Sequence, residues 1–328
     1  MIKTGVIGIG HLGKEHVRVL AKLPDAELTG VYDTDHTRAR QIAEQYQCTA
    51  FNTVEDLLYS VEALIIASPT LTHYNYGKLS IAAGKHVFIE KPISANLQDA
   101  QRLVSLAKKH KVKVQLGHIE RFNPAIIAIA DILDNPLFIE ANRIAPFTPR
   151  GTDVSVVTDL MIHDIDIILS LVKSPVKKVT AVGIPVLTSD IDIANAKIEF
   201  KNGAMANITA SRIALKRERK IRFFQKTAYI SLDYQDKFAL IVRKKPEIDE
   251  IMQNIMKTSK TPQPAQMYET EELKAQEKEP LEAELEHFIN AIIYDKRPVV
   301  NAEDGCEALR IAVRIMADIE KHKKNILV

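Results

Sequence analysis

The chain has few cysteines, almost no net charge and no long apolar run, and each shortage excludes a class of protein. Cys48 and Cys306 are far apart in a chain of 328 residues. We therefore expect no disulfide framework, no metal site and a reducing compartment, the cytoplasm. Its 44 basic and 42 acidic residues give a net charge of +2, too little to indicate a nucleic-acid or membrane partner. No apolar run approaches membrane-spanning length, and the first residues lack the pattern of a secretion signal.

The remaining composition is that of a globular protein, with 46% apolar and 26% charged residues. A chain of this length exceeds the size of a typical single core. The rhythm of the sequence changes after residue 118. We therefore predict two domains, residues 1–118 and residues 119–328.

Residues 1–118 alternate short β-branched runs with amphipathic segments. This alternation predicts an α/β domain with a doubly wound parallel (Rossmann) sheet. The expected strands are 3–9, 27–33, 63–68, 85–90 and 113–118, and the expected helices are 11–23, 35–46, 54–59, 73–84 and 96–110.

Residues 119–328 instead place closely spaced alternating runs between helices. They predict an α+β domain on a largely antiparallel, open sheet. An open sheet leaves an apolar face, which favours a homodimer or homotetramer. The polar segment 244–266 is left unassigned. The expected strands are 176–184, 193–200, 204–213, 220–225, 228–234 and 238–243, and the expected helices are 123–133, 159–172, 280–293 and 303–322.

A glycine-rich turn follows the first expected strand and opens the first helix, in the sequence "GIGHLG". Gly8 permits the tight turn, Gly10 lets the backbone approach a pyrophosphate, and Gly13 lets the helix pack closely. The N-terminus of the following helix offers unpaired N–H groups to phosphates. The motif in this context predicts a dinucleotide cofactor.

Asp33 ends the second expected strand, 20 residues beyond Gly13. A carboxylate at this position accepts hydrogen bonds from an adenosine ribose and repels a 2′-phosphate. The sequence therefore predicts NAD, with NADP less favoured. Arg38 and Arg40 lie nearby and would soften that preference.

Two further segments follow expected strands, at the edge of the sheet where ligands gather. "SPTLTHY" contains Ser68, Pro69, Thr70 and His73, and "EKPIS" contains Glu90, Lys91 and Pro92. Pro92 favours extended backbone at Lys91. By itself, the second segment fits a surface lysine before a turn as well as a lysine beside a nicotinamide.

The stretch "DLMIHDIDIIL" places polar residues in an otherwise apolar helix. Asp159, His163, Asp166 and Ser170 are spaced to share one stripe of that helix. Carboxylates are rarely buried without partners. The stripe therefore indicates a polar site, although a helix histidine taken alone is more often structural.

Together, "GIGHLG", "SPTLTH", "EKP", the Asp159–His163 pair and "VVNAEDGCEALRIAVRI" resemble the glucose–fructose oxidoreductase/inositol dehydrogenase (Gfo/Idh/MocA) family over essentially the whole chain. The resemblance implies an NAD(P)-dependent oxidoreductase acting on CH–OH groups, with Lys91, Asp159 and His163 at the reacting hydroxyl. His163 is then the general base, and the polar stripe faces the nicotinamide. The expected cofactor-binding residues are Gly8, Gly10, His11, Leu12, Gly13, Asp33, Ser68, Pro69, Thr70, His73, Glu90 and Lys91.

The chemistry of these side chains fits that assignment. Oxidising a secondary alcohol requires removal of the hydroxyl proton, and an imidazole has an ordinary pKa of about 6.5. Lys91 would hydrogen-bond the oxygen where negative charge develops. Asp159 would fix the tautomer of His163 or bind a neighbouring hydroxyl. Asp166 fits a supporting role at least as well.

The segment "GHIERFNPA", together with "DLMIHDIDIIL", resembles the branch of the family that oxidises the 3-hydroxyl of UDP-N-acetylglucosamine. This implies a sugar or sugar-nucleotide substrate, with Arg121 and Asn123 near the sugar. Arg143 and Arg150 are expected diphosphate ligands, because guanidinium groups suit phosphate oxygens, although surface exposure fits them equally. The basic run "KRERKIR" reads as a solvated hairpin. Alternatives are an inositol or free-sugar dehydrogenase, an NAD-dependent glycosidase, and a non-catalytic NAD-binding regulator.

Overall fold

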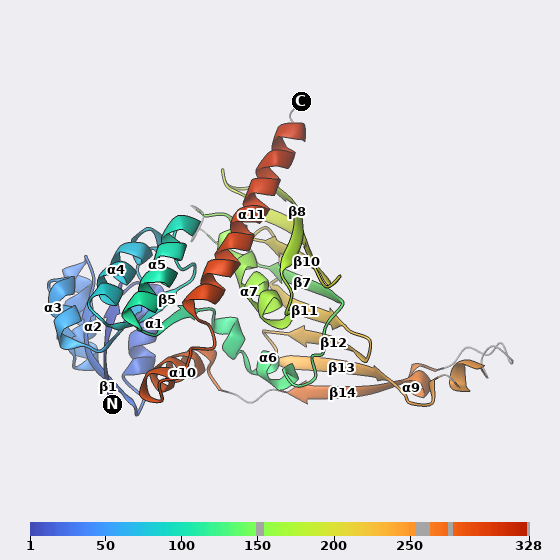
Figure 1. Cartoon of the computed structure of the whole chain (residues 1–328), viewed down its shortest axis with the longest axis horizontal. Helices are drawn as coiled ribbons and strands as arrows, with labels where there is room; N and C mark the ends of the chain where they lie inside the picture. Colours follow the sequence, from blue (N-terminus) through green and yellow to red (C-terminus); the bar gives the residue numbers. More distant parts are fainter. Residues whose placement is uncertain (149–153, 249, 254–262, 275–277, 327–328) are drawn as a thin grey trace. The chain divides into compact units, whose positions relative to one another are not determined.

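The computed structural model describes residues 1–148, 154–248, 250–253, 263–274 and 278–326 (Figure 1). The chain forms two compact units. The first unit consists of Met1–Phe122 and Lys278–Val313, and the second consists of Asn123–Glu277 and Arg314–Val328. The first unit therefore includes a C-terminal segment that the sequence division at residue 118 placed with the second domain.

The first unit contains a parallel six-stranded sheet in the order β3-β2-β1-β4-β5-β6. This is the order of a Rossmann sheet, so the predicted fold class is confirmed. Its strands are β1 (Ile2–Ile7), β2 (Ala26–Tyr32), β3 (Thr49–Ala50), β4 (Ala63–Ile66), β5 (His86–Glu90) and β6 (Val114–Gly117). Its helices are α1 (His11–Leu20), α2 (His36–Tyr46), α3 (Val54–Ser60), α4 (Thr70–Ala82), α5 (Leu97–His110), α10 (Pro280–Ile293) and the first half of α11 (Ala302–Ile326).

Continuous apolar runs make the central strands of this sheet. All four residues of β4 are fully buried, as expected for a parallel strand with helices on both faces. Side-chain caps fix where several helices begin: the Asn96 side chain accepts a hydrogen bond from the N–H of Asp99 at the start of α5. Because the strands are parallel, their carboxyl ends meet along one edge of the sheet.

Helix α10 belongs to the first unit because its apolar face completes that unit's core. Leu285, Phe288 and Ile289 are buried in one cluster with Phe88 of β5, and the rings of Phe88 and Phe288 meet edge to face, with centroids 5.9 Å apart. The sequence pattern predicts this helix with the observed bounds. It does not indicate which sheet the helix covers.

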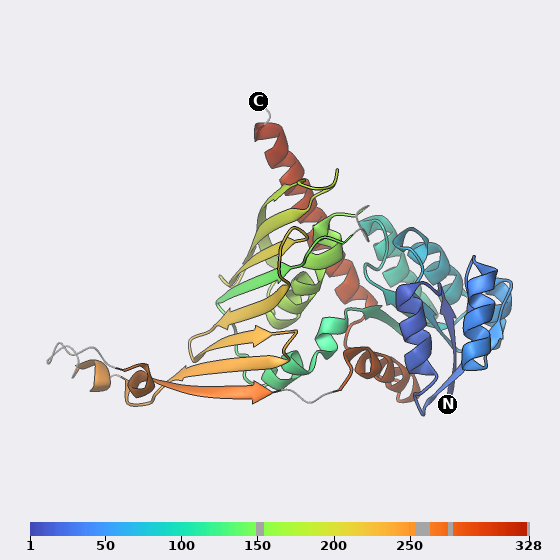
Figure 2. The same ribbon diagram turned by 180° about the vertical axis from the view of Figure 1, so that it is seen from behind.

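The second unit contains an eight-stranded sheet in the order β14-β13-β12-β11-β7-β10-β9-β8 among the described residues (Figure 2). Only the β7–β10 pair in this set is parallel, so the sheet is largely antiparallel, as predicted. The strands are β7 (Phe138–Ile144), β8 (Val176–Ile184), β9 (Ile193–Phe200), β10 (Met205–Ser211), β11 (Glu218–Phe224), β12 (Ala228–Asp233), β13 (Phe238–Lys244) and β14 (Tyr268–Lys274).

Alternation along these strands buries one face of the sheet. In β7, β9 and β10, every second residue is buried and most intervening residues are half-buried. Helix α6 (Pro124–Ile129) contacts β12, β13 and β14, whereas α7 (Ile162–Leu171) contacts β7 and β10. The end of α11 lies against β8, where the Asp318 carboxylate accepts the N–H of Ala181 at 2.7 Å. Within the described residues, no helix has the length and apolarity needed to span a membrane.

Several local features differ from the sequence prediction. Strands β3, β7 and β14 and the short helix α9 (Pro264–Met267) were not expected. Arg219, which was expected in a hairpin, lies on β11, and this strand begins two residues earlier than predicted. The expected helix from residue 159 begins with a π-helical turn, η2 (Val157–Met161), before α7. This turn winds more widely than an α-helix and changes the angular spacing of the predicted polar stripe.

Candidate active site

The glycine turn between β1 and α1 has the shape that a dinucleotide requires. Gly8 has a φ of +89°, and a Cβ there would lie 2.6 Å from the Cα of Ser68. A Cβ at Gly13 would lie only 1.8 Å from the carbonyl oxygen of Gly8. In contrast, a Cβ at Gly10 would meet nothing within 4 Å. The fold thus requires Gly8 and Gly13, while the space beside Gly10 fits a cofactor pyrophosphate.

The first turn of α1 and the end of β2 flank this space. His11 and Leu12 are exposed on that turn, Leu12 by 49%. Asp33 follows β2, and its carboxylate accepts the N–H of Ile9 at 2.6 Å and the N–H of Asp35 at 2.8 Å. These bonds orient the Asp33 carboxylate at the glycine turn, where the sequence predicted that it would bind the adenosine ribose.

Arg38 faces acidic groups at this position. Its guanidinium lies 3.0 Å from Asp35 and 3.6 Å from Asp33. Two carboxylates therefore offset its charge. This arrangement weakens the expectation that Arg38 would favour a 2′-phosphate.

The loop after β4 carries Ser68, Pro69 and Thr70 to the start of α4, which begins at Thr70. His73 was expected to contact the cofactor, but it is buried in α4 with 1% of its surface exposed. Its Nδ1 lies 2.8 Å from the Pro92 carbonyl oxygen, and its Nε2 lies 2.8 Å from the Ser68 carbonyl oxygen. The ring thus joins two loops at the carboxyl edge of the sheet, rather than facing outward toward a ligand.

The loop after β5 carries Glu90, Lys91 and Pro92. Glu90 is almost fully buried, and its Oε1 lies 2.7 Å from Nε2 of His16 on α1. Its Oε2 accepts the backbone N–H of Lys91 at 3.2 Å. Lys91 is half-buried, and the Lys91–Pro92 peptide is cis. The lysine therefore lies at the edge predicted for the cofactor, in a segment that buried groups hold.

In the second unit, the π-helical turn carries Asp159 and the first turn of α7 carries His163, and both side chains are half-buried. The N–H of Asp159 bonds to the Ser155 carbonyl oxygen at 3.0 Å. Single π-helical turns occur frequently at functional sites. Asp166 is buried, with 1% of its surface exposed.

Arg143 was expected to bind a diphosphate, but it forms a buried ion pair. Its Nε and Nη2 donate to the two carboxylate oxygens of Asp164 at 2.7 and 3.0 Å. Arg143 is 2% and Asp164 1% exposed, and the guanidinium also lies over the Tyr234 ring, 5.2 Å from its centroid. Because its planar face and two of its N–H groups are engaged in the protein interior, this geometry does not support a phosphate-binding role for Arg143.

The structure places the other expected substrate ligands differently. Arg121 is half-buried on the short helix η1 (Ile119–Phe122). Asn123 is 5% exposed and caps α6 by accepting the N–H of Ala125. Arg150 lies outside the described residues.

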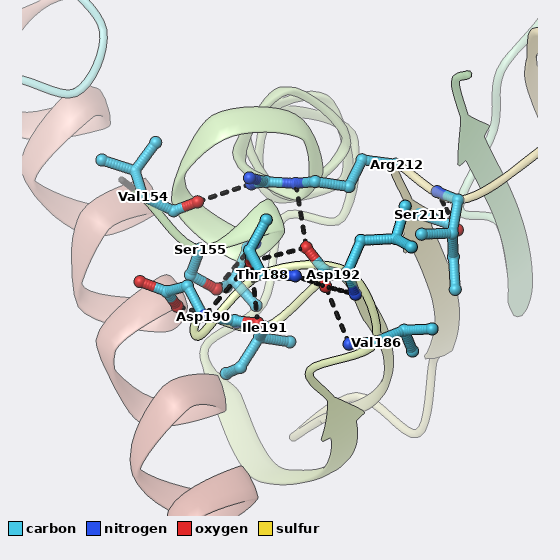
Figure 3. Close-up of polar contacts among 12 residues, drawn as sticks. Val154, Ser155, Val186, Thr188, Asp190, Ile191, Asp192, Ser211 and Arg212 are labelled. Carbon is cyan, nitrogen blue, oxygen red and sulfur yellow. Dashed lines mark hydrogen bonds and ion pairs between the residues drawn. The ribbon is translucent and has the colours of Figure 1, made fainter. Parts of the chain in front are cut away.

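A buried aspartate, Asp192, holds the turn at residues 186–188, and Arg212 beside it bonds Val154 in the segment that leads into η2 (Figure 3). Oδ2 of Asp192 accepts three backbone N–H groups, from Val186, Leu187 and Thr188, at 2.6 to 2.8 Å. Burial raises the pKa of Asp192, but these bonds outweigh it and lower the pKa to about 2. Arg212 lies 3.8 Å from Oδ1 of Asp192 and donates to the carbonyl oxygen of Val154.

Sequence reasoning missed the groups that hold these loops. His16, Asp164 and Arg212 have no local motif, and each acquires its polar contact from a distant part of the chain. Asp192 also has no recognised motif, although its three N–H donors lie four to six residues before it. Glu90 was predicted as a cofactor residue, but its bond to His16 was not. The one signal available for Asp164 was that it is a polar residue within an apolar run. That signal was used for the neighbouring residues Asp159, His163 and Asp166, and Asp164 was not considered.

A Rossmann sheet with an open glycine turn, an acidic residue after β2 and a lysine after β5 defines the first unit as that of a dinucleotide-dependent oxidoreductase. The chain belongs to the Gfo/Idh/MocA oxidoreductase family. The family's NAD-binding Rossmann-fold domain matches residues 2–118, and its C-terminal alpha/beta domain matches residues 144–326.

Among the relatives, UDP-N-acetylglucosamine 3-dehydrogenase of Acidithiobacillus ferrooxidans is 32% identical over 324 residues, covering 97% of each chain. A solved structure of that enzyme superposes with a TM-score of 0.88 over 98% of each chain. Inositol 2-dehydrogenase of Agrobacterium fabrum is 32% identical over 51% of this chain and 53% of its own. The scyllo-inositol dehydrogenase of Lactobacillus casei, solved with NAD(H) and scyllo-inositol, shares the fold at a TM-score of 0.79, with 20% identity and 98% of each chain covered.

Proposed function

We propose that this oxidoreductase oxidises the 3-hydroxyl of UDP-N-acetylglucosamine to a ketone, with NAD as the hydride acceptor. The observation that carries the proposal is the similarity to a UDP-N-acetylglucosamine 3-dehydrogenase along nearly the whole chain. The inositol dehydrogenases among these relatives align in sequence over 51% to 65% of this chain. Sequence identity of 32% along nearly the whole chain favours a sugar nucleotide over inositol.

Three side chains are proposed to act on the reacting hydroxyl. His163 takes the hydroxyl proton, because an imidazole has an ordinary pKa near neutral pH. Asp159 orients the His163 ring or binds a neighbouring hydroxyl. Lys91 donates a hydrogen bond to the oxygen as it gains negative charge. The nicotinamide, when bound, accepts the hydride from the carbon, so that a C=O bond replaces the C–H and O–H bonds.

The proposed preference for NAD over NADP rests on Asp33. Its carboxylate is fixed by two backbone N–H groups at the end of β2. A carboxylate held there would accept bonds from ribose hydroxyls and repel a 2′-phosphate. We expect kcat/KM with NAD to exceed that with NADP, and Asp33→Ala to narrow the difference.

The test incubates the purified protein with NAD and UDP-N-acetylglucosamine and follows the absorbance of NADH. We expect turnover to fall about 10²- to 10⁴-fold in Lys91→Met and in His163→Gln, the range for loss of a proton-transfer or oxyanion-stabilising group. Lys78→Met is the matched control, because Lys78 is exposed on α4 and should retain turnover.

Other outcomes identify the alternatives. Oxidation of free inositol or glucose, without turnover of the sugar nucleotide, would replace the proposed substrate. Dye release from a chromogenic N-acetylgalactosaminide without net NADH would indicate an NAD-dependent glycosidase. NAD binding with no turnover of any sugar would indicate a non-catalytic regulator.

We also propose that the chain assembles as a homodimer or homotetramer. The contact would form through the face of the eight-stranded sheet opposite the face that carries the fully buried residues. Phe138, Phe224 and Tyr229 form a half-buried aromatic group on this sheet, with centroids 5.1 to 5.3 Å apart. Light scattering tests this assembly, and a monomer at working concentration would contradict it. The cytoplasmic location stays a prediction from the low cysteine content.

A further inference from the structure

The segment Glu90–Lys91–Pro92 is held by two imidazoles that come from different helices. His16 on α1 contacts the Glu90 carboxylate, and His73 on α4 contacts the Pro92 carbonyl oxygen, at 2.7 and 2.8 Å. Each histidine is 1% exposed. Lys91 therefore lies between two residues that buried rings hold in place.

Glu90 links His16 to the backbone of Lys91 through its two carboxylate oxygens. One carboxylate oxygen faces His16, and the other accepts the backbone N–H of Lys91. Burial raises the pKa of Glu90, but the hydrogen bond and electrostatic attraction of His16, followed by the positive charge and backbone N–H of Lys91, outweigh it, so the net shift is downward. Gly117 of β6 packs so closely that a Cβ there would lie 2.8 Å from Oε2. The charged carboxylate thus has little room to move.

The proton that His16 shares with Glu90 can be assigned to one nitrogen. Nδ1 of His16 is buried and meets no hydrogen-bond partner in the part of the chain that the structure describes. A buried N–H without an acceptor is costly, whereas a lone pair is less so. The proton therefore lies on Nε2 and is donated to Glu90.

His73 extends the constraint to the neighbouring loop. Its two ring nitrogens each lie 2.8 Å from a carbonyl oxygen, one from Pro92 and one from Ser68. A neutral imidazole has one N–H and bonds one of these carbonyls, whereas an imidazolium bonds both. The ring sets the spacing between the loop after β4 and the loop after β5, which carry residues predicted to bind the cofactor.

We propose that His16 and His73 are positioning residues for Lys91: they fix the Glu90–Lys91–Pro92 backbone so that the ammonium group reaches the reacting oxygen. The chemical role of Lys91 rests on the proposed function. A displacement of about 1 Å near a reacting centre costs about 10²-fold in rate. Neither histidine needs to touch cofactor or sugar to influence the reaction.

The kinetic test compares His16→Ala with His16→Gln, since the glutamine amide N–H donates from nearly the same place as Nε2. We expect His16→Ala to lower kcat about 10- to 100-fold, with the KM for the sugar nucleotide changed by less than about threefold. His16→Gln should recover most of kcat. His73→Asn retains one donor for Pro92 but loses the Ser68 contact. Its kcat should lie between those of His16→Ala and His16→Gln. His110→Gln, a half-buried histidine at the end of α5, is the matched control.

A second measurement reads the position of Lys91 without any sugar. Lysines are reductively methylated with ¹³C-formaldehyde, and the Lys91 signal is assigned by its loss in Lys91→Arg. We expect this signal to shift in His16→Ala and His73→Ala and to keep its wild-type position in His16→Gln and His110→Gln. The dispersion of the other lysine signals and the melting temperature report whether each variant is folded.

The two measurements separate the two proposals. If the wild type oxidises no sugar, the proposed function fails, while the Lys91 signal still tests positioning. If folded alanine variants leave both kcat and the Lys91 signal unchanged, the positioning proposal is overturned. It is also overturned if His16→Gln lowers kcat as much as His16→Ala, because the donated hydrogen bond would then not be what matters.

Discussion

The two units stabilise their buried polar groups in different ways. In the first unit, the central groups are imidazoles: His16 bonds Glu90, and His73 joins Ser68 to Pro92. In the second unit, they are aspartates that face arginines, Asp164 with Arg143 and Asp192 with Arg212. Both arrangements hold a loop or helix that carries a proposed catalytic residue. The imidazole contacts and the aspartate–arginine pairs differ in charge. The stability of the two units should therefore respond differently to substitution and to pH.

The difference follows from the type of sheet. Parallel strands carry their loops to one edge, where one buried imidazole lies between two loops: His73 is 2.8 Å from the carbonyl oxygens of both Ser68 and Pro92. In the antiparallel sheet, long side chains on the strands reach the covering helix: Arg143 on β7 extends to Asp164 on α7. A buried carboxylate requires an opposite charge or several N–H donors, whereas a buried neutral imidazole requires only a hydrogen-bond partner.

The largest expected effect is in the second unit. Arg143→Met removes the partner of a buried carboxylate and should lower the free energy of unfolding by about 3–5 kcal/mol, because Asp164 then stays buried without its counter-charge. Denaturant unfolding measures this change. Arg222→Met is the matched control: its pair with Glu140 at 2.8 Å is half-exposed, and its loss should cost about 1 kcal/mol or less.

A double variant sharpens this prediction. Arg143→Met with Asp164→Leu removes both charges and should recover much of the lost stability, since apolar replacements of buried ion pairs are often tolerated. Equal losses in Arg143→Met and Arg222→Met would contradict the view that burial of the charge sets the cost.

An intermediate effect is expected at the glycine turn of the first unit. Gly10→Ala should leave thermal stability within about 0.5 kcal/mol, because its Cβ enters open space, but should weaken NAD binding at least tenfold, about 1.4 kcal/mol. Calorimetric titration with NAD measures the affinity. Gly13→Ala, whose Cβ would collide with the Gly8 carbonyl, should instead lower stability. An unchanged Kd in Gly10→Ala would place the cofactor elsewhere.

The smallest expected effect is a difference in acid response. Burial lowers the pKa of His73, His86 and His287 below the ordinary 6.5, and all three belong to the first unit. Below pH 6.5 the unfolded chain binds protons that the folded unit does not, so stability falls as the pH drops toward the folded pKa values. Asp192 has a pKa of about 2 against 3.8, so its contribution is lost only below about pH 4.

Native-state hydrogen exchange, corrected for intrinsic rates, separates the two responses. Between pH 7 and pH 5, peptides from the first unit should lose protection while those around Asp192 keep theirs. His73→Phe, His86→Phe and His287→Phe should each reduce the loss in the first unit. Parallel loss in both units would show that the buried histidines do not determine the acid response.

Much of the fold could be predicted because its signals are local. The alternation in residues 1–118 predicts every helix of that region and each strand except the two-residue β3. In the second unit, β8 and β9 have the predicted bounds. Strand β7 was missed because a buried position is occupied by Arg143, which a hydrophobicity pattern reads as exposed. Strand β14 was missed because six of its seven residues are exposed.

The site was predicted less completely than the fold. Each glycine of the turn has the predicted steric character, and Asp33 lies at the turn as expected. The roles of Lys91, Asp159 and His163 stay predictions. Arg143 was assigned to a diphosphate because guanidinium groups suit phosphate oxygens, and His73 to the cofactor because it lies in the segment "SPTLTH" that resembles the family. Arg143 pairs with Asp164, 21 residues away, and His73 contacts Pro92, 19 residues away, as well as Ser68 within its own segment; no local motif indicates the two distant partners.

The sequence by itself determined the elements that depend on neighbouring residues. These are the parallel strands of the first sheet, the glycine turn and the presence of α10. Only the tertiary structure decided which polar groups are buried together. It joined His16 to Glu90 across 74 residues, paired Arg143 with Asp164 and packed α10 on the first core. The physical reason is that burying a polar group is favourable only when its partner is buried with it, and the partner can come from anywhere in the chain.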